Sequence, residues 1–317
     1  MSRLRIVFCG TPEFAVPSFN RLLDQNEFEI LGVFTQPDRP RGRGQEVSFS
    51  PIKEAALSAG ISVHQPPKIR APEVEEQLRA LAAEVIVIIA YGQIIPARLL
   101  PIPRLGWINL HASLLPKYRG AAPIAWAIAN GESVTGNTSM RIDAGMDTGE
   151  MLLQQKLAIG ADETAPELAK RLGEAGAELI VETLRGLVSE SLRARLQDST
   201  NASYAPILKR EDGRIDWAKP AKEIYNRMRG FTPWPGAFTQ FRGQTCHVWG
   251  RPAGLGKSGD ASTPGTLLAD HEKLTVVCAA ATRIELSHVK LEGRKQISAA
   301  EFANGARLRP GERFGQV

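Results

Sequence analysis

The sequence predicts an α/β protein with two domains: an N-terminal doubly wound, Rossmann-like domain and a C-terminal small β-barrel of OB-like type. Two observations favour this fold class. Apolar strands alternate with helical segments in the first half, as in a parallel sheet covered by helices. Beyond Tyr204 the chain changes to short apolar runs separated by glycine and proline, as in small barrels. A length of 317 residues suits two domains.

The N-terminal elements follow in order along the chain. A buried strand at 4–9 leads into the turn Gly10-Thr-Pro12, which predicts a capped helix reaching about residue 23. The strand predicted at 84–91 is apolar on both faces and is therefore expected in the middle of the sheet. The remaining expectations are strands at 29–35 and 107–111, helices at 52–59, 72–82, 122–130 and 164–188, and segments 137–143 and 151–159 flanking a Gly-rich loop.

The domain boundary is expected in a polar connector rich in Ser, Arg and Gln. We therefore predict a catalytic domain over 1–189, a linker over 190–203 and a basic domain over 204–317. The second domain is expected to contain one helix between 221 and 229. Its strand candidates are 236–243, 246–249, 265–268, 274–278 and 283–286.

Charge is distributed unevenly between these halves. Residues 1–203 contain 21 Lys and Arg against 23 Asp and Glu, whereas residues 204–317 contain 18 against 11. The net charges are therefore −2 and +7. A basic second module is typical of a nucleic-acid-binding appendage, although a surface with excess Lys and Arg would look the same.

The composition and the motifs argue against membrane, secreted, metal-binding and nucleotide-dependent proteins. The apolar run at 85–90 is far shorter than the about 20 residues of a membrane helix, and no secretory h-region is recognisable, which predicts a cytoplasmic protein. The three cysteines lack C-x-x-C spacing and the histidines lack metal-ligand spacing, so neither disulfides nor a metal are expected. Neither a G-x-G-x-x-G nor a P-loop motif directly follows a predicted strand, and no G-x-S-x-G motif is present.

Three polar side chains stand out at expected strand ends and loops. Asn109 and His111 are two residues apart on one strand and so project to the same side. Asp147 lies in a Gly-flanked loop that would permit close approach of a ligand. An amide donor, an imidazole and a carboxylate together can stabilise an oxyanion and manage a proton, although an Asn and a His at a strand end can also be structural caps. The chemistry left open is acyl or one-carbon transfer to an external nucleophile.

The run Trp107-Ile-Asn-Leu-His-Ala-Ser-Leu-Leu-Pro-Lys-Tyr-Arg-Gly-Ala-Ala-Pro-Ile124 resembles the signature of the folate-dependent formyltransferases. Asp143-Ala-Gly-Met-Asp-Thr-Gly149 is similar to the second motif of that family. Phe8–Phe14, Val33–Gly44, Ala90–Gly92 and Gly213–Trp217 extend the resemblance over most of the chain.

The resemblance implies a formyltransferase that moves the formyl group of 10-formyltetrahydrofolate to the amino group of methionine on initiator tRNA. It assigns catalysis to Asn109, His111 and Asp147. It also implies a folate pocket formed by two segments, Ile89, Ala90, Tyr91 and Gly92, and Ser113, Leu114, Leu115 and Pro116. Without the resemblance, the second of these segments would be interpreted as an ordinary turn that covers the core.

The resemblance further implies that an arginine-rich loop at 37–50 contacts the tRNA acceptor stem through Arg39, Arg41 and Arg43. Where the family usually carries a lysine after Tyr204-Ala-Pro206, this chain has Ile207, with Lys209 and Arg210 nearby as candidate contacts. The alternative interpretation of the three arginines is a solvated surface loop that does not bind RNA. We expect a monomer.

The catalytic trio does not identify the formyl acceptor. Glycinamide ribonucleotide, an amino sugar nucleotide or water would use the same three residues. The arginine loop and the basic second domain favour RNA, because a small acceptor needs neither. A tRNA-binding protein with a degenerate folate pocket is disfavoured by the intact trio.

Overall fold

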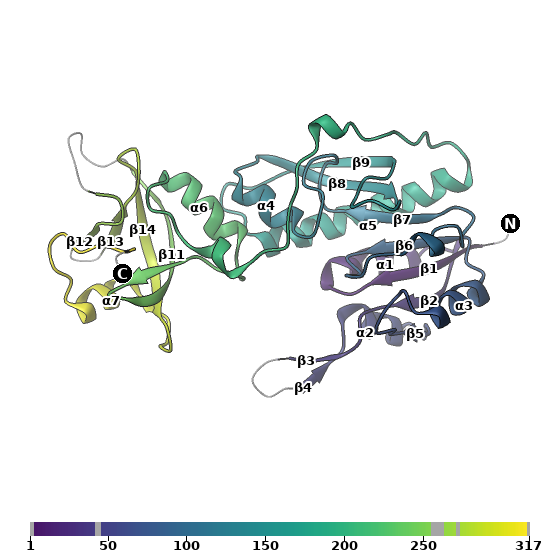
Figure 1. Ribbon diagram of the computed structural model, residues 1–317, viewed down its shortest axis with the longest axis horizontal. Helices are drawn as coiled ribbons and strands as arrows, with labels where there is room; N and C mark the ends of the chain where they lie inside the picture. The colour runs from purple at the N-terminus through teal and green to yellow at the C-terminus, as the bar shows by residue number, and fades with distance from the viewer. Residues whose placement is uncertain (1–2, 42–45, 255–262, 271–272, 316–317) are drawn as a thin grey trace. The chain divides into compact units, whose positions relative to one another are not determined.

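The computed structural model describes residues 3–41, 46–254, 263–270 and 273–315 (Figure 1). The chain forms two compact units. The first comprises Met1–Pro123, Val134–Ala158 and Glu167–Pro206, and the second comprises Ile124–Ser133, Ile159–Pro166 and Ile207–Val317. The second unit therefore includes two segments from the middle of the chain.

The first unit contains a seven-stranded sheet in the order β5-β2-β1-β6-β7-β8-β9. The strands are β1 (Leu4–Gly10), β2 (Phe28–Phe34), β5 (Val63–His64), β6 (Val85–Ile89), β7 (Trp107–His111), β8 (Val134–Arg141) and β9 (Met151–Ala158). The first five strands of that order are parallel, and β8 and β9 continue the sheet as antiparallel strands. The predicted doubly wound sheet is confirmed, with β6 fully buried near its middle.

Helices cover both faces of this sheet, which explains the apolar strands. The helices of the unit are α1 (Val16–Leu23), α2 (Pro51–Ser58), α3 (Pro72–Leu81) and α5 (Ala165–Val188). Ile108 and Leu110 of β7 face the cluster that contains the buried residues of α1, α2 and α5. Trp107 faces the opposite cluster, with Val74 of α3. Alternate residues of β7 thus point to different faces.

The helix predicted directly after Gly10-Thr-Pro12 begins differently. Residues Glu13–Ala15 form a short 3₁₀ turn (η1), and α1 starts only at Val16. The Thr11 hydroxyl does not cap either helix but donates to the Tyr91 carbonyl, 3.1 Å away. The predicted cap was therefore wrong, because a partner distant in sequence competes for the same hydroxyl.

The predicted arginine-rich loop contains a short ribbon. β3 (Arg39–Arg41) pairs antiparallel with β4 (Glu46–Ser48). Arg43 lies outside the described residues.

The described residues of the second unit form an antiparallel sheet with three α-helices and one short 3₁₀ helix. The sheet order is β10-β11-β14-β13-β12, with β15 paired to β14. At one end Leu267 donates to the Glu312 carbonyl, and at the other Gly315 donates to the Gln240 carbonyl, so residues 312–315 link the two edges. The elements are α4 (Pro123–Ala129), η4 (Arg210–Gly213), α6 (Ala221–Gly230), β10 (Phe238–Phe241), β11 (Gln244–Ala253), β12 (Leu267–Asp270), β13 (Lys273–Val277), β14 (Arg283–Leu291), β15 (Ile297–Ser298) and α7 (Ala299–Ala306).

Within the described residues, no helix has both the length and the apolar character needed to span a bilayer. The same part of the chain holds no group of three or more His, Cys, Asp and Glu side chains arranged for a metal ion. The three cysteines, Cys9, Cys246 and Cys278, are free and buried.

Candidate active site

The candidate site lies where β7 ends. Ile88 of β6 pairs with Asn109, and His111 pairs with Thr138 of β8, so the end of β7 is enclosed by strands on both sides. Since Leu110 faces the α5 side, Asn109 and His111 share the opposite face. The Asn109 side chain is half-buried and has no hydrogen-bond partner within the described part of the chain. Its amide is available to a ligand.

His111 is held by a backbone carbonyl. The ring is only 6% exposed, and Nε2 lies 2.9 Å from the Tyr118 oxygen. A carbonyl only accepts, so Nε2 carries the hydrogen in this bond. Nδ1 is left to face Oδ2 of Asp147, at 3.7 Å. A proton on Nδ1 would therefore lie between the imidazole and a carboxylate.

Asp147 is fixed through both its side chain and its backbone. Its φ is +53°, a left-handed conformation that costs energy for a non-glycine residue. Oδ2 accepts a 2.8 Å hydrogen bond from the Gly120 N–H. The Asp147 carbonyl accepts a 2.7 Å hydrogen bond from Nε2 of Gln197. The carboxylate that faces His111 is thus oriented by two other segments of the chain.

Sequence reasoning missed the groups that hold the trio. Gln197 lies in the polar stretch interpreted as a linker, and the Tyr118 and Gly120 groups belong to the backbone. Only the proximity of Tyr118 and Gly120 to the His111 motif could have drawn attention to them. No pattern in the sequence marks Gln197.

The first set of folate candidates follows β6. Ala90 and Gly92 are exposed and have positive φ values of 47° and 84°. They border a cavity of about 370 Å³ whose lining also includes Thr11, Gln36 and Asp38. The Tyr91 carbonyl already accepts hydrogen bonds from Thr11 and Gln36.

The side chains of the other two residues in this set are buried in the core. Ile89 is 0% exposed and Tyr91 is 1% exposed. Burial raises the pKa of the Tyr91 phenol. These two residues therefore present mainly their backbone to the cavity edge.

One carboxylate in the cavity wall is charged and paired. The hydrogen bond from Lys53 holds the pKa of the Asp38 carboxyl below its ordinary value. Gln65 donates a second hydrogen bond to Asp38, at 2.9 Å. The cavity wall therefore carries a neutralised ion pair rather than a free negative charge.

The second set of candidates, residues 113–116, forms a loop secured by internal contacts. The Ser113 hydroxyl donates to the Lys117 carbonyl at 2.6 Å, and the Leu115 N–H donates to Oγ1 of Thr138 at 3.1 Å. Leu115 is buried in a cluster with Met140 and Met151. Leu114 and Pro116 are half-buried.

The RNA-contact candidates belong to different units of the chain. Arg39 and Arg41 belong to β3, whereas Lys209 and Arg210 lie in the second unit and are exposed. The Lys209 N–H donates to the Asp212 carboxylate at 2.7 Å.

Comparison with known proteins defines the class. Residues 4–184 match the formyl transferase family model, and residues 207–307 match the model for the formyl transferase C-terminal domain. The chain belongs to the formyl transferase family.

Within that family, three relatives that match over nearly their full length share one name. A methionyl-tRNA formyltransferase of Solibacter usitatus is 51% identical over 99% of this chain and 99% of the relative. The methionyl-tRNA formyltransferase of Koribacter versatilis is 49% identical over 98% and 99% of the two chains. That of Geobacter sulfurreducens is 47% identical over 100% and 98%.

Solved structures share the fold at lower identity. WlaRD, a sugar 3N-formyl transferase, aligns with a TM-score of 0.64 at 19% identity, covering 93% of this chain and 100% of that one. An N-formyltransferase from Helicobacter canadensis aligns with the same TM-score and identity over 90% and 99%. These likenesses support the two-part architecture.

Proposed function

We propose that this protein transfers the formyl group of 10-formyltetrahydrofolate to the amino group of methionine on initiator methionyl-tRNA. The observation that carries the proposal is the convergence of His111 and Asp147, with Nδ1 and Oδ2 3.7 Å apart, on the face of β7 that also carries the half-buried Asn109. The full-length relatives named methionyl-tRNA formyltransferase support the choice of acceptor.

The three side chains suit the charges that develop during formyl transfer. A neutral amine attacks the formyl carbon, negative charge grows on the formyl oxygen, and the attacking nitrogen must lose a proton. The bond between the formyl carbon and N10 of the folate then breaks, and N10 takes up a proton as tetrahydrofolate leaves. Asn109 donates to that oxygen, and protonated His111 stabilises the same charge. Removing one such donor from an ordered site costs about 3 to 4 kcal/mol of transition-state stabilisation. Asp147 supports the charged imidazole and helps to remove the amine proton.

The residues around the cavity fit the folate co-substrate. A cavity of about 370 Å³ can hold a flat ring system. Ala90 and Gly92 present little side-chain bulk there, so backbone groups can approach the edge of the ring. The folate supplies the activated formyl group. The chain binds it and orients it toward the end of β7.

The basic residues supply the surface for RNA. The second domain has a net charge of +7 over residues 204–317, and phosphate neutralisation dominates non-specific affinity for nucleic acids. Lys209 and Arg210, together with Arg39, Arg41 and Arg43 of the N-terminal segment, are the contacts we assign. The protein acts as a monomer in the cytoplasm.

A sugar nucleotide is the competing acceptor, because the solved structures with the same fold include sugar formyltransferases. Their identity to this chain is 19%, against 51% for the methionyl-tRNA formyltransferase of Solibacter usitatus. Acceptor competition separates the two functions.

The test measures formylmethionine formed from charged initiator tRNA, and formylated sugar from an aminodeoxy sugar nucleotide, each with formylated folate. We expect product only on the tRNA. His111→Ala and Asp147→Ala should each abolish that product while melting like the wild type and still retarding initiator tRNA in a gel. Formylation of the sugar alone would overturn the proposed acceptor, and substantial turnover by either folded variant would overturn the assigned roles.

A further inference from the structure

The segment before the second unit is tied to the catalytic loop by one side chain. Nε2 of Gln197 donates to two carbonyl oxygens, that of Asp147 at 2.7 Å and that of Gly149 at 2.8 Å. Both amide hydrogens are therefore used on residues flanking the same turn. Residues 143–146, which precede Asp147 in this loop, are exposed to solvent.

The orientation of the Gln197 amide is dictated by a buried arginine. Oε1 accepts from Nε and Nη2 of Arg119, at 3.0 and 2.8 Å. A guanidinium has only donors, so the oxygen must face Arg119 and the NH₂ group must face the carbonyls. Arg119 is 3% exposed, which removes water as a competing partner.

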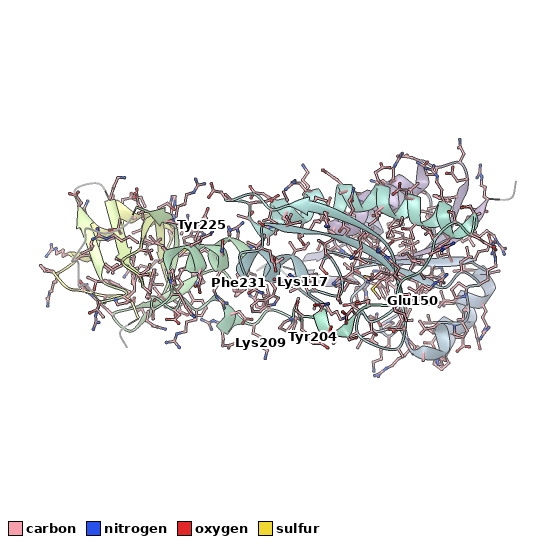
Figure 2. All side chains as sticks on the ribbon, turned by 90° about the horizontal axis from the view of Figure 1, so that it is seen from above. Lys117, Glu150, Tyr204, Lys209, Tyr225 and Phe231 are labelled. Atoms are coloured by element: carbon pink, nitrogen blue, oxygen red, sulfur yellow. The ribbon has the colours of Figure 1, made fainter. Side chains whose placement is uncertain are left out.

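Backbone pairing holds Gln197 from both sides along the chain. Arg195 exchanges two hydrogen bonds with Met151, at 2.8 and 2.9 Å. Farther on, the Arg119 N–H donates to the Ser203 carbonyl and the Ala205 N–H donates to the Arg119 carbonyl. The side chain of Tyr204, which lies between Ser203 and Ala205 in the sequence, is exposed and is labelled in Figure 2. The Gln197 side chain is thus anchored in a fixed place before it meets Asp147.

Arg119 also connects this contact to the histidine side of the site. The next residue, Gly120, donates its N–H to Oδ2 of Asp147. The preceding residue, Tyr118, supplies the carbonyl that holds His111. Three consecutive residues therefore fix His111, Gln197 and Asp147 in turn.

We propose that Gln197 is a positioning residue that, oriented by Arg119, sets the distance between the Asp147 carboxylate and His111. The inference rests on the proposed function of the site. Gln197 itself touches no reacting atom. Displacement of a catalytic group by about 1 Å can cost on the order of 100-fold in rate, so loss of this contact is expected in kcat.

Two substitutions separate positioning from simple support of the fold. Gln197→Met keeps the length of the side chain and removes both donors and the acceptor. Gln197→Glu keeps the acceptor for Arg119 but turns an oxygen toward the two carbonyls. The matched control is Asn201→Ala on the same segment, because Asn201 is exposed and its amide contacts only Asp198.

We expect both Gln197 variants to lose at least tenfold in kcat, with KM for folate and for tRNA changed by less than twofold. The pH profile of kcat should also move, because the carboxylate no longer faces the imidazole at its original distance. Asn201→Ala should match the wild type. Wild-type kcat and pH profile in either folded Gln197 variant would overturn the inference.

A crystal structure of Gln197→Met provides a readout independent of turnover. The Asp147 carboxylate should be displaced from the Gly120 N–H, and an unmoved carboxylate contradicts the proposal. If the methionine variant does not fold, the same measurement is made on the glutamate variant. If the wild-type protein formylates no tRNA, the proposed function is refuted. The position of the Asp147 carboxylate in the variant structure then still tests whether Gln197 positions it.

Discussion

Asn109 and His111 project from the same face of one strand but are held in different ways. The imidazole is buried and bound to the Tyr118 carbonyl, whereas the amide is half-buried and has no partner in the described structure. The amide can therefore bind a developing charge without first breaking a hydrogen bond. Nε2 of His111 is committed to the Tyr118 carbonyl, so Nδ1 is the nitrogen that would act in the proposed reaction.

We expect Asn109→Ala to lower kcat about 100- to 1,000-fold, the range for loss of one oxyanion donor. The melting temperature should remain near that of the wild type, because no buried partner is left unsatisfied. Steady-state kinetics and thermal melting test this. Asn109→Asp, an acceptor of similar shape, should be at least as inactive, and wild-type turnover in either variant would contradict the donor role.

At the scale of single residues, the sequence predicts the proposed catalytic side chains better than it predicts the groups that hold them in place. Asn109, His111 and Asp147 belong to recognisable motifs. Gln197 and Arg119 act through contacts between segments that are distant in sequence, and no local pattern specifies those contacts. The assignment of the Tyr118 carbonyl required the fold, because every residue carries such a group.

Among the elements, the β8–β9 hairpin determines where Asp147 lies. The Arg141 N–H donates to the Glu150 carbonyl at the end of the hairpin, at 2.9 Å. Gly149 lies in this narrow place, where an added Cβ would come 1.9 Å from the Arg141 carbonyl oxygen. Only a residue without a side chain permits this closure.

Gly149→Ala should therefore open the hairpin, destabilise the protein by about 1 to 3 kcal/mol and reduce kcat. Gly305→Ala is the matched control, because no atom lies within 4 Å of a Cβ at that position in α7. The control should preserve activity and leave the stability equal or slightly higher. Denaturant unfolding and measurement of kcat test this prediction. A Gly149→Ala protein with wild-type stability and kcat would contradict the close approach of residue 149 to the Arg141 carbonyl.

Most long elements were predictable from apolar periodicity, including β6 and α5. The two-residue strand β5 and helix α7 were not predicted. β5 is too short to show alternation, and the Ser298–Glu301 capping box that begins α7 was not recognised. The pairing directions of β8 and β9 depend on the whole sheet, so local patterns did not specify them.

On the scale of the whole molecule, the second unit is assembled from separated parts of the chain. The Trp126 ring contacts Phe231 edge-on, with centroids 5.2 Å apart. Arg229 donates to the Gly160 and Glu163 carbonyls, and Tyr225 donates to Asp162. Residues 124–133 and 159–166 are therefore part of this unit's interior and its polar contacts.

A fragment of residues 207–317 should consequently be less stable than its β-sheet alone would suggest. We expect a broadened thermal transition and a dye-binding apolar surface around Phe231, because the Trp126 ring that packs against it is missing. Calorimetry and dye fluorescence measure this. A sharp transition without dye binding would show that the fragment is self-sufficient.

This interleaving has a consequence during biosynthesis. Helix α4 leaves the ribosome long before the residues of α6 that complete its surroundings. Until then, Trp126 remains on a nascent chain without Phe231, the ring it contacts, a state in which apolar segments invite aggregation. During the interval between the synthesis of these two helices, a newly made molecule therefore exposes an apolar segment that chaperones can protect.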